Sequence, residues 1–175
     1  MADVFSSHNF SPHSEVRAAV YLMKYESSKE TLYKIGISNL GSVDKRRMAL
    51  QRSIDKSSTS NDYVVEVVDY FECKNKYQAY EIEHVFLGYS RLRDSIGSKK
   101  HGRDISGNRE LFSRGIVKKW EFYRDNGKFD PKGINGLDIV RYCKKILQSR
   151  WPEAEEEIAK YPEAILLYAR DVIKG

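Results

Sequence analysis

Cysteine is scarce in this sequence. Only Cys73 and Cys143 occur among 175 residues, far apart in the chain, and no histidine lies at metal-ligand spacing from either. This pattern excludes a disulfide scaffold and a Cys/His zinc site. We interpret both cysteines as ordinary free thiols of a protein that works in a reducing cytoplasm.

Long hydrophobic runs, a targeting segment and internal repeats are also missing. No apolar run approaches the ~20 residues that span a bilayer, and Met1–Phe5 lacks the basic and apolar regions of a signal peptide. With 41% hydrophobic and 31% charged residues, the composition is typical of a soluble globular protein. The 175 residues suffice for one domain with an appendage. We therefore expect a cytoplasmic protein that does not enter a membrane.

Positive charge is concentrated in one part of the chain. The formal net charge is +5, yet the segment 91–132 alone holds twelve Lys and Arg residues against six Asp and Glu residues, a local excess of +6. Such a surface attracts phosphates, because binding releases condensed counterions. A solvated basic face without a partner is the alternative. The predicted nucleic-acid contacts in this segment are Lys99, Lys100, Arg103 and Arg109.

The hydrophobic pattern predicts strands first and helices later. Two β-prone runs, 18–23 and 31–37, are joined by the polar stretch 26–30, which predicts a hairpin over 17–38. Ser42 is placed to cap a helix over 43–54, and the β-branched run 63–71 predicts a strand. A second helix is predicted over 76–93, and a Gly/Lys/Ser loop follows over 95–108. Next come a short strand over 110–112 and a segment, 117–123, that fits strand or helix.

Turn residues from Asp125 to Gly136 suggest a boundary, and helices are predicted over 137–150, 152–160 and 163–174. We expect an α+β fold with a small three-stranded antiparallel sheet flanked by helices and a helical C-terminal extension. The predicted parts are a flexible lead at 1–16, a central domain at 17–124 and the extension at 125–175.

Four short motifs occur in order between residues 17 and 115. They are Val20-Tyr21-Leu22, Lys34-Ile35-Gly36-Ile37-Ser38, Arg47-Met48-Ala49-Leu50, and Ala79-x-x-x-Glu83 with the later Arg109-Glu110-Leu111-Phe112. In this order they resemble the GIY-YIG nuclease superfamily, and more narrowly its phage and bacterial subgroup with a Lys-Ile-Gly second motif. Two departures are the missing glycine before Tyr21 and Lys34 in place of the second tyrosine.

The resemblance implies a metal-dependent DNA endonuclease that hydrolyses phosphodiester bonds by water attack. Tyr21 would orient or deprotonate the water, with Lys34 as the cation that lowers its pKa or as a phosphate contact. Arg47 would clamp the phosphate, since a planar guanidinium can bridge two phosphoryl oxygens. We prefer Arg47 to Arg46 because an apolar residue follows it, as in the family motif.

Glu83 is the candidate ligand for one divalent cation, Mg²⁺ or Mn²⁺, because its spacing from Ala79 matches the family motif. Glu81 also has apolar neighbours at helical spacing, so periodicity alone does not choose between the two carboxylates. His84 is a candidate proton-transfer group, with a plain helix-surface residue as its alternative. We expect Tyr21, Arg47 and Glu83 to surround one cleft.

Two other functions fit the same sequence. A catalytically silent nucleic-acid-binding module of the same fold would keep the basic surface, and the replaced tyrosine at Lys34 favours it. A protein-interaction domain would use the C-terminal helices as its docking surface. Each site residue also has a structural reading, with Tyr21 as a half-buried strand aromatic and Arg47 as a surface charge.

Overall fold

A computed structural model describes residues 16–56, 63–93 and 111–174 of the chain. The predicted N-terminal lead and the four predicted nucleic-acid contacts, Lys99, Lys100, Arg103 and Arg109, lie outside these residues. Their roles therefore stay predictions.

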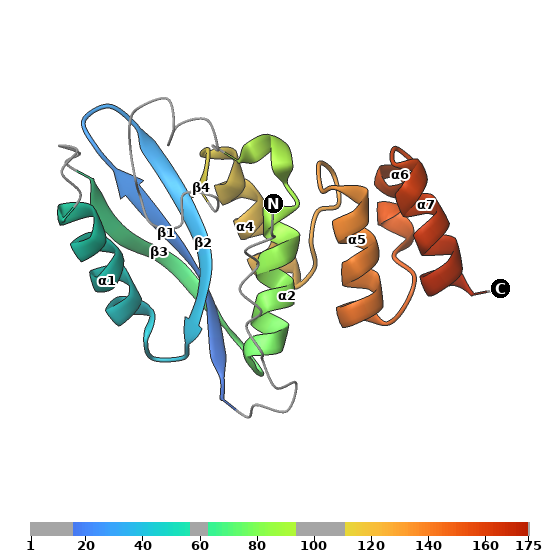
Figure 1. Ribbon diagram of the computed structural model, residues 1–175, viewed down its shortest axis with the longest axis horizontal. Helices are drawn as coiled ribbons and strands as arrows, with labels where there is room; N and C mark the ends of the chain where they lie inside the picture. The colour runs from blue at the N-terminus through green and yellow to red at the C-terminus, as the bar shows by residue number, and fades with distance from the viewer. Residues whose placement is uncertain (1–15, 57–62, 94–110, 175) are drawn as a thin grey trace, which may run out of the picture.

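An antiparallel sheet with the strand order β3-β1-β2-β4 forms the centre of the fold (Figure 1). Its strands are β1 (Ala18–Glu26), β2 (Thr31–Asn39), β3 (Val64–Cys73) and β4 (Leu111–Phe112). The predicted α+β class is confirmed, and the sheet has one strand more than predicted. The short strand predicted over 110–112 is β4, which has two residues, pairs with Tyr33 and Lys34 of β2 and forms a single bridge from Phe112 to Arg93.

The predicted hairpin is the pair β1–β2. Its turn is closed by the Ser27 amide, which donates to the Glu30 carbonyl over 3.0 Å, and by the Ser27 hydroxyl, which accepts from the Glu30 amide. Alternate residues of β1 enter two different hydrophobic clusters, with Leu22 in one and Tyr21 in the other. Both faces are therefore buried, which explains why these antiparallel strands have continuous apolar runs instead of strict alternation.

Helix α1 (Val43–Asp55) covers the face that carries Tyr21, which we call the α1 face. Its buried residues Val43, Leu50 and Ile54 follow helical spacing and pack into the same cluster as Tyr21. Ser42 occupies the N-cap position as predicted, without a side-chain hydrogen bond to the helix.

Helices α2 (Lys76–Leu87) and α4 (Gly115–Asn126) cover the opposite face, the α2 face (Figure 1). The segment 117–123, which fitted strand or helix, is helical. Asn75 caps α2 by accepting from the Gln78 amide over 2.9 Å. The helix ends at Leu87, before the predicted residue 93, and a Cβ at Gly88 would lie 2.9 Å from a carboxylate oxygen of Asp138. A 3₁₀ turn, η1 (Ser90–Leu92), follows.

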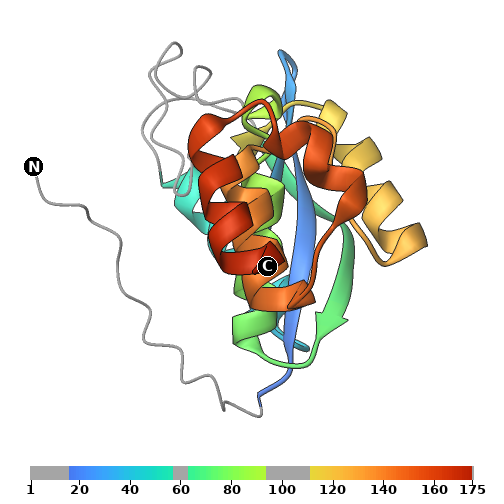
Figure 2. The same cartoon turned by 90° about the vertical axis from the view of Figure 1, so that its right-hand side faces the viewer.

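The C-terminal part is helical, near the predicted ranges. Figure 2 shows its helices in front of α2, with the sheet behind. Among the described residues, none of the helices combines the length and apolar character needed to cross a membrane. The elements are α5 (Gly136–Tyr142) with a π-helical turn η3 (Cys143–Leu147), a 3₁₀ turn η4 (Pro152–Ala154) with α6 (Glu155–Ile158), and α7 (Pro162–Tyr168) with a π-helical turn η5 (Ala169–Ile173).

One hydrophobic cluster joins the sheet to the C-terminal helices. The Phe86 ring of α2 lies 5.4 Å from Trp120 of α4 and 4.9 Å from Phe129, and Phe129 lies 5.2 Å from Tyr142 of α5. The predicted boundary falls at the end of α4, where Gly127 takes a positive φ of 66°. Packing continues across this boundary, because the cluster extends from Ala18 to Tyr168.

Both thiols are expected to resist modification in the folded protein. Cys73 and Cys143 are buried and free, and burial raises their pKa to about 11 and about 12. At pH 8 almost no thiolate forms, so a disulfide reagent such as Ellman's reagent should release little chromophore from native protein and two equivalents in guanidinium. Fast reaction of either thiol without denaturant would contradict this burial.

Candidate functional site

Tyr21 and Lys34 lie on the same face of the sheet. Tyr21 pairs with Gly36 and Lys34 pairs with Met23 in the β1–β2 register, which makes Tyr21 and Lys34 diagonal neighbours. Each side chain is buried, with 1% of its residue surface exposed. A lysine can act on the tyrosine hydroxyl only from the same face, and the register meets that condition. Lysine is rarely buried to this extent, because its charge must be paired when it leaves water.

Gly36 makes room for the Tyr21 ring. A Cβ built on Gly36 would lie 2.6 Å from Cζ of Tyr21, closer than real Cβ contacts come. The ring therefore crosses from β1 onto β2, and its hydroxyl end lies over the strand that carries Lys34. This close approach gives a steric reason for glycine at this position of the second motif.

Arg47 reaches the α1 face from the helix. It lies between Val43 and Leu50 on the stripe that packs against the sheet, whereas Arg46 is exposed and lies off this stripe. The Arg47 Nε donates to Oδ1 of Asp44 over 2.8 Å, and 30% of its side-chain surface is exposed. The structure thus brings Tyr21, Lys34 and Arg47 to one face of the sheet.

Glu83 comes from the other side of the sheet. It lies on α2, which packs over β1 and β2 on the α2 face, and it is buried with 8% exposure. Helical spacing puts Glu83 beside Ala79, at the border of the sheet-facing stripe and away from α5. Glu83 and Tyr21 are therefore on opposite faces, and the expectation that Tyr21, Arg47 and Glu83 surround one cleft is wrong for Glu83.

Glu81 and His84 belong to the contact between α2 and α5. Arg141 binds Glu81 with two hydrogen bonds of 2.8 and 2.9 Å, and the Glu81 side chain is 4% exposed. His84 Nε2 lies 3.0 Å from Oδ1 of Asp138. Both residues thus have structural partners on the side of α2 that is turned away from Glu83. Glu83 stays the predicted metal ligand through its spacing from Ala79, and the Asp138 contact gives His84 a structural role between α2 and α5.

The described residues restrict the kind of metal site. In the ranges 16–56, 63–93 and 111–174, no group of three or more His, Cys, Asp or Glu side chains could hold an ion. A site of many protein ligands is therefore not formed by these residues. A Mg²⁺ site with one carboxylate, completed by water and substrate phosphate, would need no protein ligand besides Glu83.

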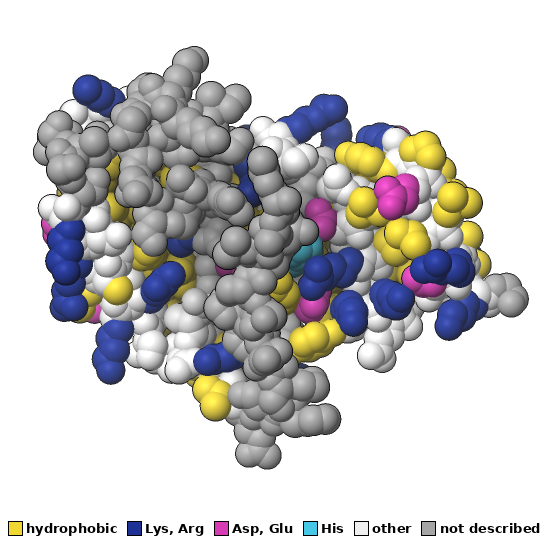
Figure 3. Space-filling model, in the orientation of Figure 1, with side chains coloured by type: hydrophobic (Ala, Val, Ile, Leu, Met, Phe, Trp, Pro, Cys, Tyr) yellow, Lys and Arg dark blue, Asp and Glu magenta, His cyan; other side chains and the backbone are white. Residues whose placement is uncertain are grey.

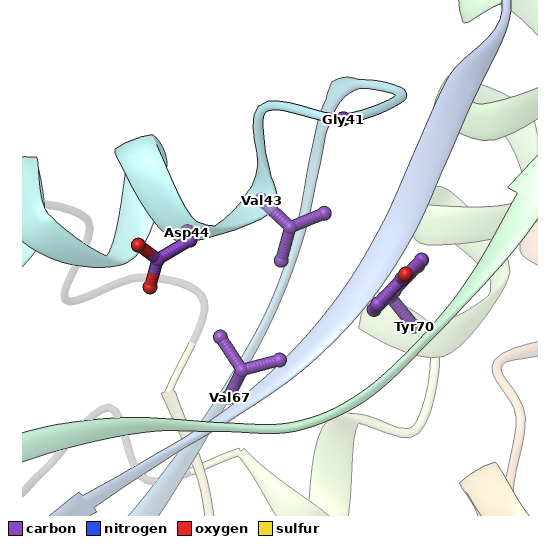
Figure 4. A pocket seen from close by; sticks show the side chains of 5 residues that line it. All are labelled: Gly41, Val43, Asp44, Val67 and Tyr70. Atoms are coloured by element: carbon purple, nitrogen blue, oxygen red, sulfur yellow. The ribbon is translucent and has the colours of Figure 1, made fainter.

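A groove of about 330 Å³ opens on the α1 face, between the start of α1 and β3 (Figure 4). Its lining is formed by Gly41, Val43, Asp44, Val67 and Tyr70. Tyr70 is a lining residue that the sequence does not indicate, because strict alternation along β3 does not predict its face. A bulge at Val68 shifts the register between Met23 and Leu22, so that Tyr70 pairs with Tyr21 and shares its face.

Comparison of the chain with protein-family models, with curated proteins and with solved structures found no match. The likeness to GIY-YIG nucleases therefore depends on the motifs in this sequence alone.

Arg141 is expected to stabilise the fold by balancing a buried carboxylate. Replacing Arg141 with Ala leaves Glu81 uncompensated and should lower the unfolding free energy by about 2–3 kcal/mol, below a fully buried pair because Arg141 is partly exposed. Adding Glu81→Gln should restore part of the loss. Urea unfolding measures both, with the exposed Lys145→Ala as control. An Arg141→Ala loss as small as that of the control would contradict this role.

Gly36→Ala is expected to displace the Tyr21 ring. The added methyl group overpacks a buried contact, so stability should fall by about 1–2 kcal/mol in urea unfolding. Combining it with Tyr21→Val removes the obstructing ring, and the two losses should then be far from additive. Additive losses would mean that the ring does not limit the space over Gly36.

Proposed function

We propose that this protein is a divalent-metal-dependent DNA endonuclease that cuts phosphodiester bonds by water attack. The observation that supports it most is the burial of Tyr21 beside Lys34, under the helix that carries Arg47. A hydroxyl, an ammonium and a guanidinium on one face are the groups needed to handle a water and a phosphate. Tyr21 also packs in the hydrophobic cluster on the α1 face, whereas a lysine at 1% exposure is unusual in such a cluster.

In this proposal the chain's own residues position the reactants. The Tyr21 hydroxyl accepts a hydrogen bond from the attacking water, and the Lys34 ammonium favours negative charge that develops beside it. Arg47 binds phosphoryl oxygens through its terminal Nη donors, because Asp44 already holds its Nε–H. The Asp44 contact fixes the guanidinium on the helix, which lowers the entropy lost on binding.

Glu83 would hold Mg²⁺ or Mn²⁺, which when bound stabilises the charge on the reacting phosphate. Since Tyr21 and Glu83 lie on opposite faces, the scissile phosphate would lie along the edge of β2 near Gly36. The Tyr21 ring extends toward this edge from one face, and α2 brings Glu83 toward it from the other.

A catalytically silent DNA-binding module is the second candidate. Lys34, which stands where the family motif has tyrosine, favours this alternative because an ammonium binds phosphate without supplying a hydroxyl. The two functions are separated by incubating the protein with supercoiled plasmid and Mg²⁺ or Mn²⁺, with and without EDTA. Nicked or linear product that disappears with EDTA supports the nuclease; salt-dependent binding without product supports the silent module.

Glu83→Gln separates a catalytic carboxylate from a structural one. The substitution removes the charge and nearly preserves the shape, so cleavage should fall by roughly two orders of magnitude or more because metal-assisted charge stabilisation supplies several kcal/mol. DNA affinity in EDTA should hold or rise. Gel assays of cleavage and binding measure the two effects.

The matched control is Glu81→Gln on the same helix. This variant should lose stability while its cleavage rate at low temperature stays near that of wild type, because Glu81 pairs with Arg141. A Glu83→Gln variant that cuts at the wild-type rate would reject Glu83 as the ligand. If Glu81→Gln lost cleavage while Glu83→Gln cut at the wild-type rate, Glu81 would be the metal ligand instead.

A further inference from the structure

Tyr70 offers an exposed aromatic ring next to the candidate site. It is 52% exposed, although it pairs directly with the buried Tyr21 on the α1 face. The Tyr21 ring crosses toward β2 and Gly36, which leaves the space on the β3 side to Tyr70. The ring is therefore available to a ligand on the same face as Lys34 and Arg47.

The residues that line the groove beside Tyr70 suit a flat ring with polar edges. Val43 and Val67 give it apolar walls that point toward each other, and Tyr70 stands across from them (Figure 4). The Asp44 carboxylate lies at the other end of the groove and can accept hydrogen bonds from amino groups at a base edge. A nucleobase would use both the aromatic ring and the carboxylate, since its faces stack on aromatic groups and its edges form hydrogen bonds.

One turn of α1 connects this groove to the predicted phosphate contact. Asp44 lines the groove, and the same carboxylate holds the Arg47 guanidinium at 2.8 Å. A phosphate on Arg47 and a base in the groove would thus be adjacent parts of one strand. The exposed surface of α1 is basic as well, and Lys and Arg side chains follow this side of the molecule (Figure 3). The exposed basic residues of α1 are Lys45, Arg46 and Arg52.

From this juxtaposition we propose that the groove between α1 and β3 is a subsite that binds a nucleobase of the substrate strand by stacking on Tyr70. The inference rests on the proposed function and adds how the substrate is held. Basic charge along α1 favours a nucleic acid over an apolar or basic peptide as the occupant.

The test compares variants of Tyr70 in DNA binding. Wild type, Tyr70→Ala and Tyr70→Phe are titrated against fluorescein-labelled mixed-sequence DNA, duplex and single-stranded, in EDTA. Loss of the ring should weaken binding between about fivefold and a hundredfold, whereas Tyr70→Phe keeps the stacking face and should stay within about twofold of wild type. The matched control is Phe122→Ala, an exposed aromatic on α4 across the sheet, which should bind like wild type.

Photocrosslinking locates the base directly. DNA that carries 5-iodouracil is irradiated in complex with the full chain, and peptide mapping should place an adduct on Tyr70. Adducts confined to other peptides, or a Tyr70→Ala variant that binds like wild type, would overturn the subsite.

The outcomes also separate this inference from the proposed function. Wild type that cuts DNA while Tyr70→Ala binds and cuts equally well would overturn the subsite and leave the nuclease standing. Wild type that neither binds nor cuts DNA would overturn both. Binding and crosslinking at Tyr70 without cleavage would support the subsite on a silent binding module.

Discussion

The register between β1 and β2 is the constraint on which the rest of the structure depends. It places Tyr21 opposite Gly36 and Lys34 opposite Met23, so one face of the hairpin carries the chemical groups and the other carries Val20, Leu22 and Ile35 into the main core. A slip of one residue would exchange the two sets. Helices α1 and α2 can then pack only on the faces that this register prepares, and with them Arg47 and Glu83 are fixed on opposite sides.

The second determinant is the contact between α2 and the helical extension. The bidentate Arg141–Glu81 pair and the His84–Asp138 contact lie at this interface, beside the aromatic cluster around Phe86. The pair balances a carboxylate that is nearly inaccessible to water, and α5 approaches α2 so closely at Gly88 that a Cβ there would lie 2.9 Å from the Asp138 carboxylate. The extension is therefore part of the core, and its packing sets the rotation of α2 that turns Glu83 away from α5.

Local pattern was sufficient to predict the hairpin, α1, the start of α2, β3 and the helical C-terminal part, because each has its own periodicity and turn residues. The end of α2 was predicted at residue 93, but the helix ends at Leu87 and the 3₁₀ turn η1 follows, because local pattern does not separate such a turn from a continued helix. Of the candidate site, Tyr21 and Arg47 reach the same face, whereas Glu83 lies on the opposite one, because the sequence does not show which face of the sheet each helix covers. The roles of Glu81 and His84 were hidden, because Arg141 lies 60 residues from Glu81 in the chain.

The bulge at Val68 divides β3 into two stretches of opposite parity. Before it, odd-numbered residues such as Val65 face α1, and after it even-numbered residues such as Tyr70 do. Any method that infers orientation from uninterrupted odd–even alternation will assign half of this strand to the wrong side. Deleting one residue there would rotate Asp69 and Tyr70 to exchanged sides, and the Trp120 indole would lose the carboxylate to which it donates over 2.9 Å. The extra residue in β3 thus fixes two features at once: the exposed Tyr70 ring beside α1 and the Asp69–Trp120 hydrogen bond beneath α4.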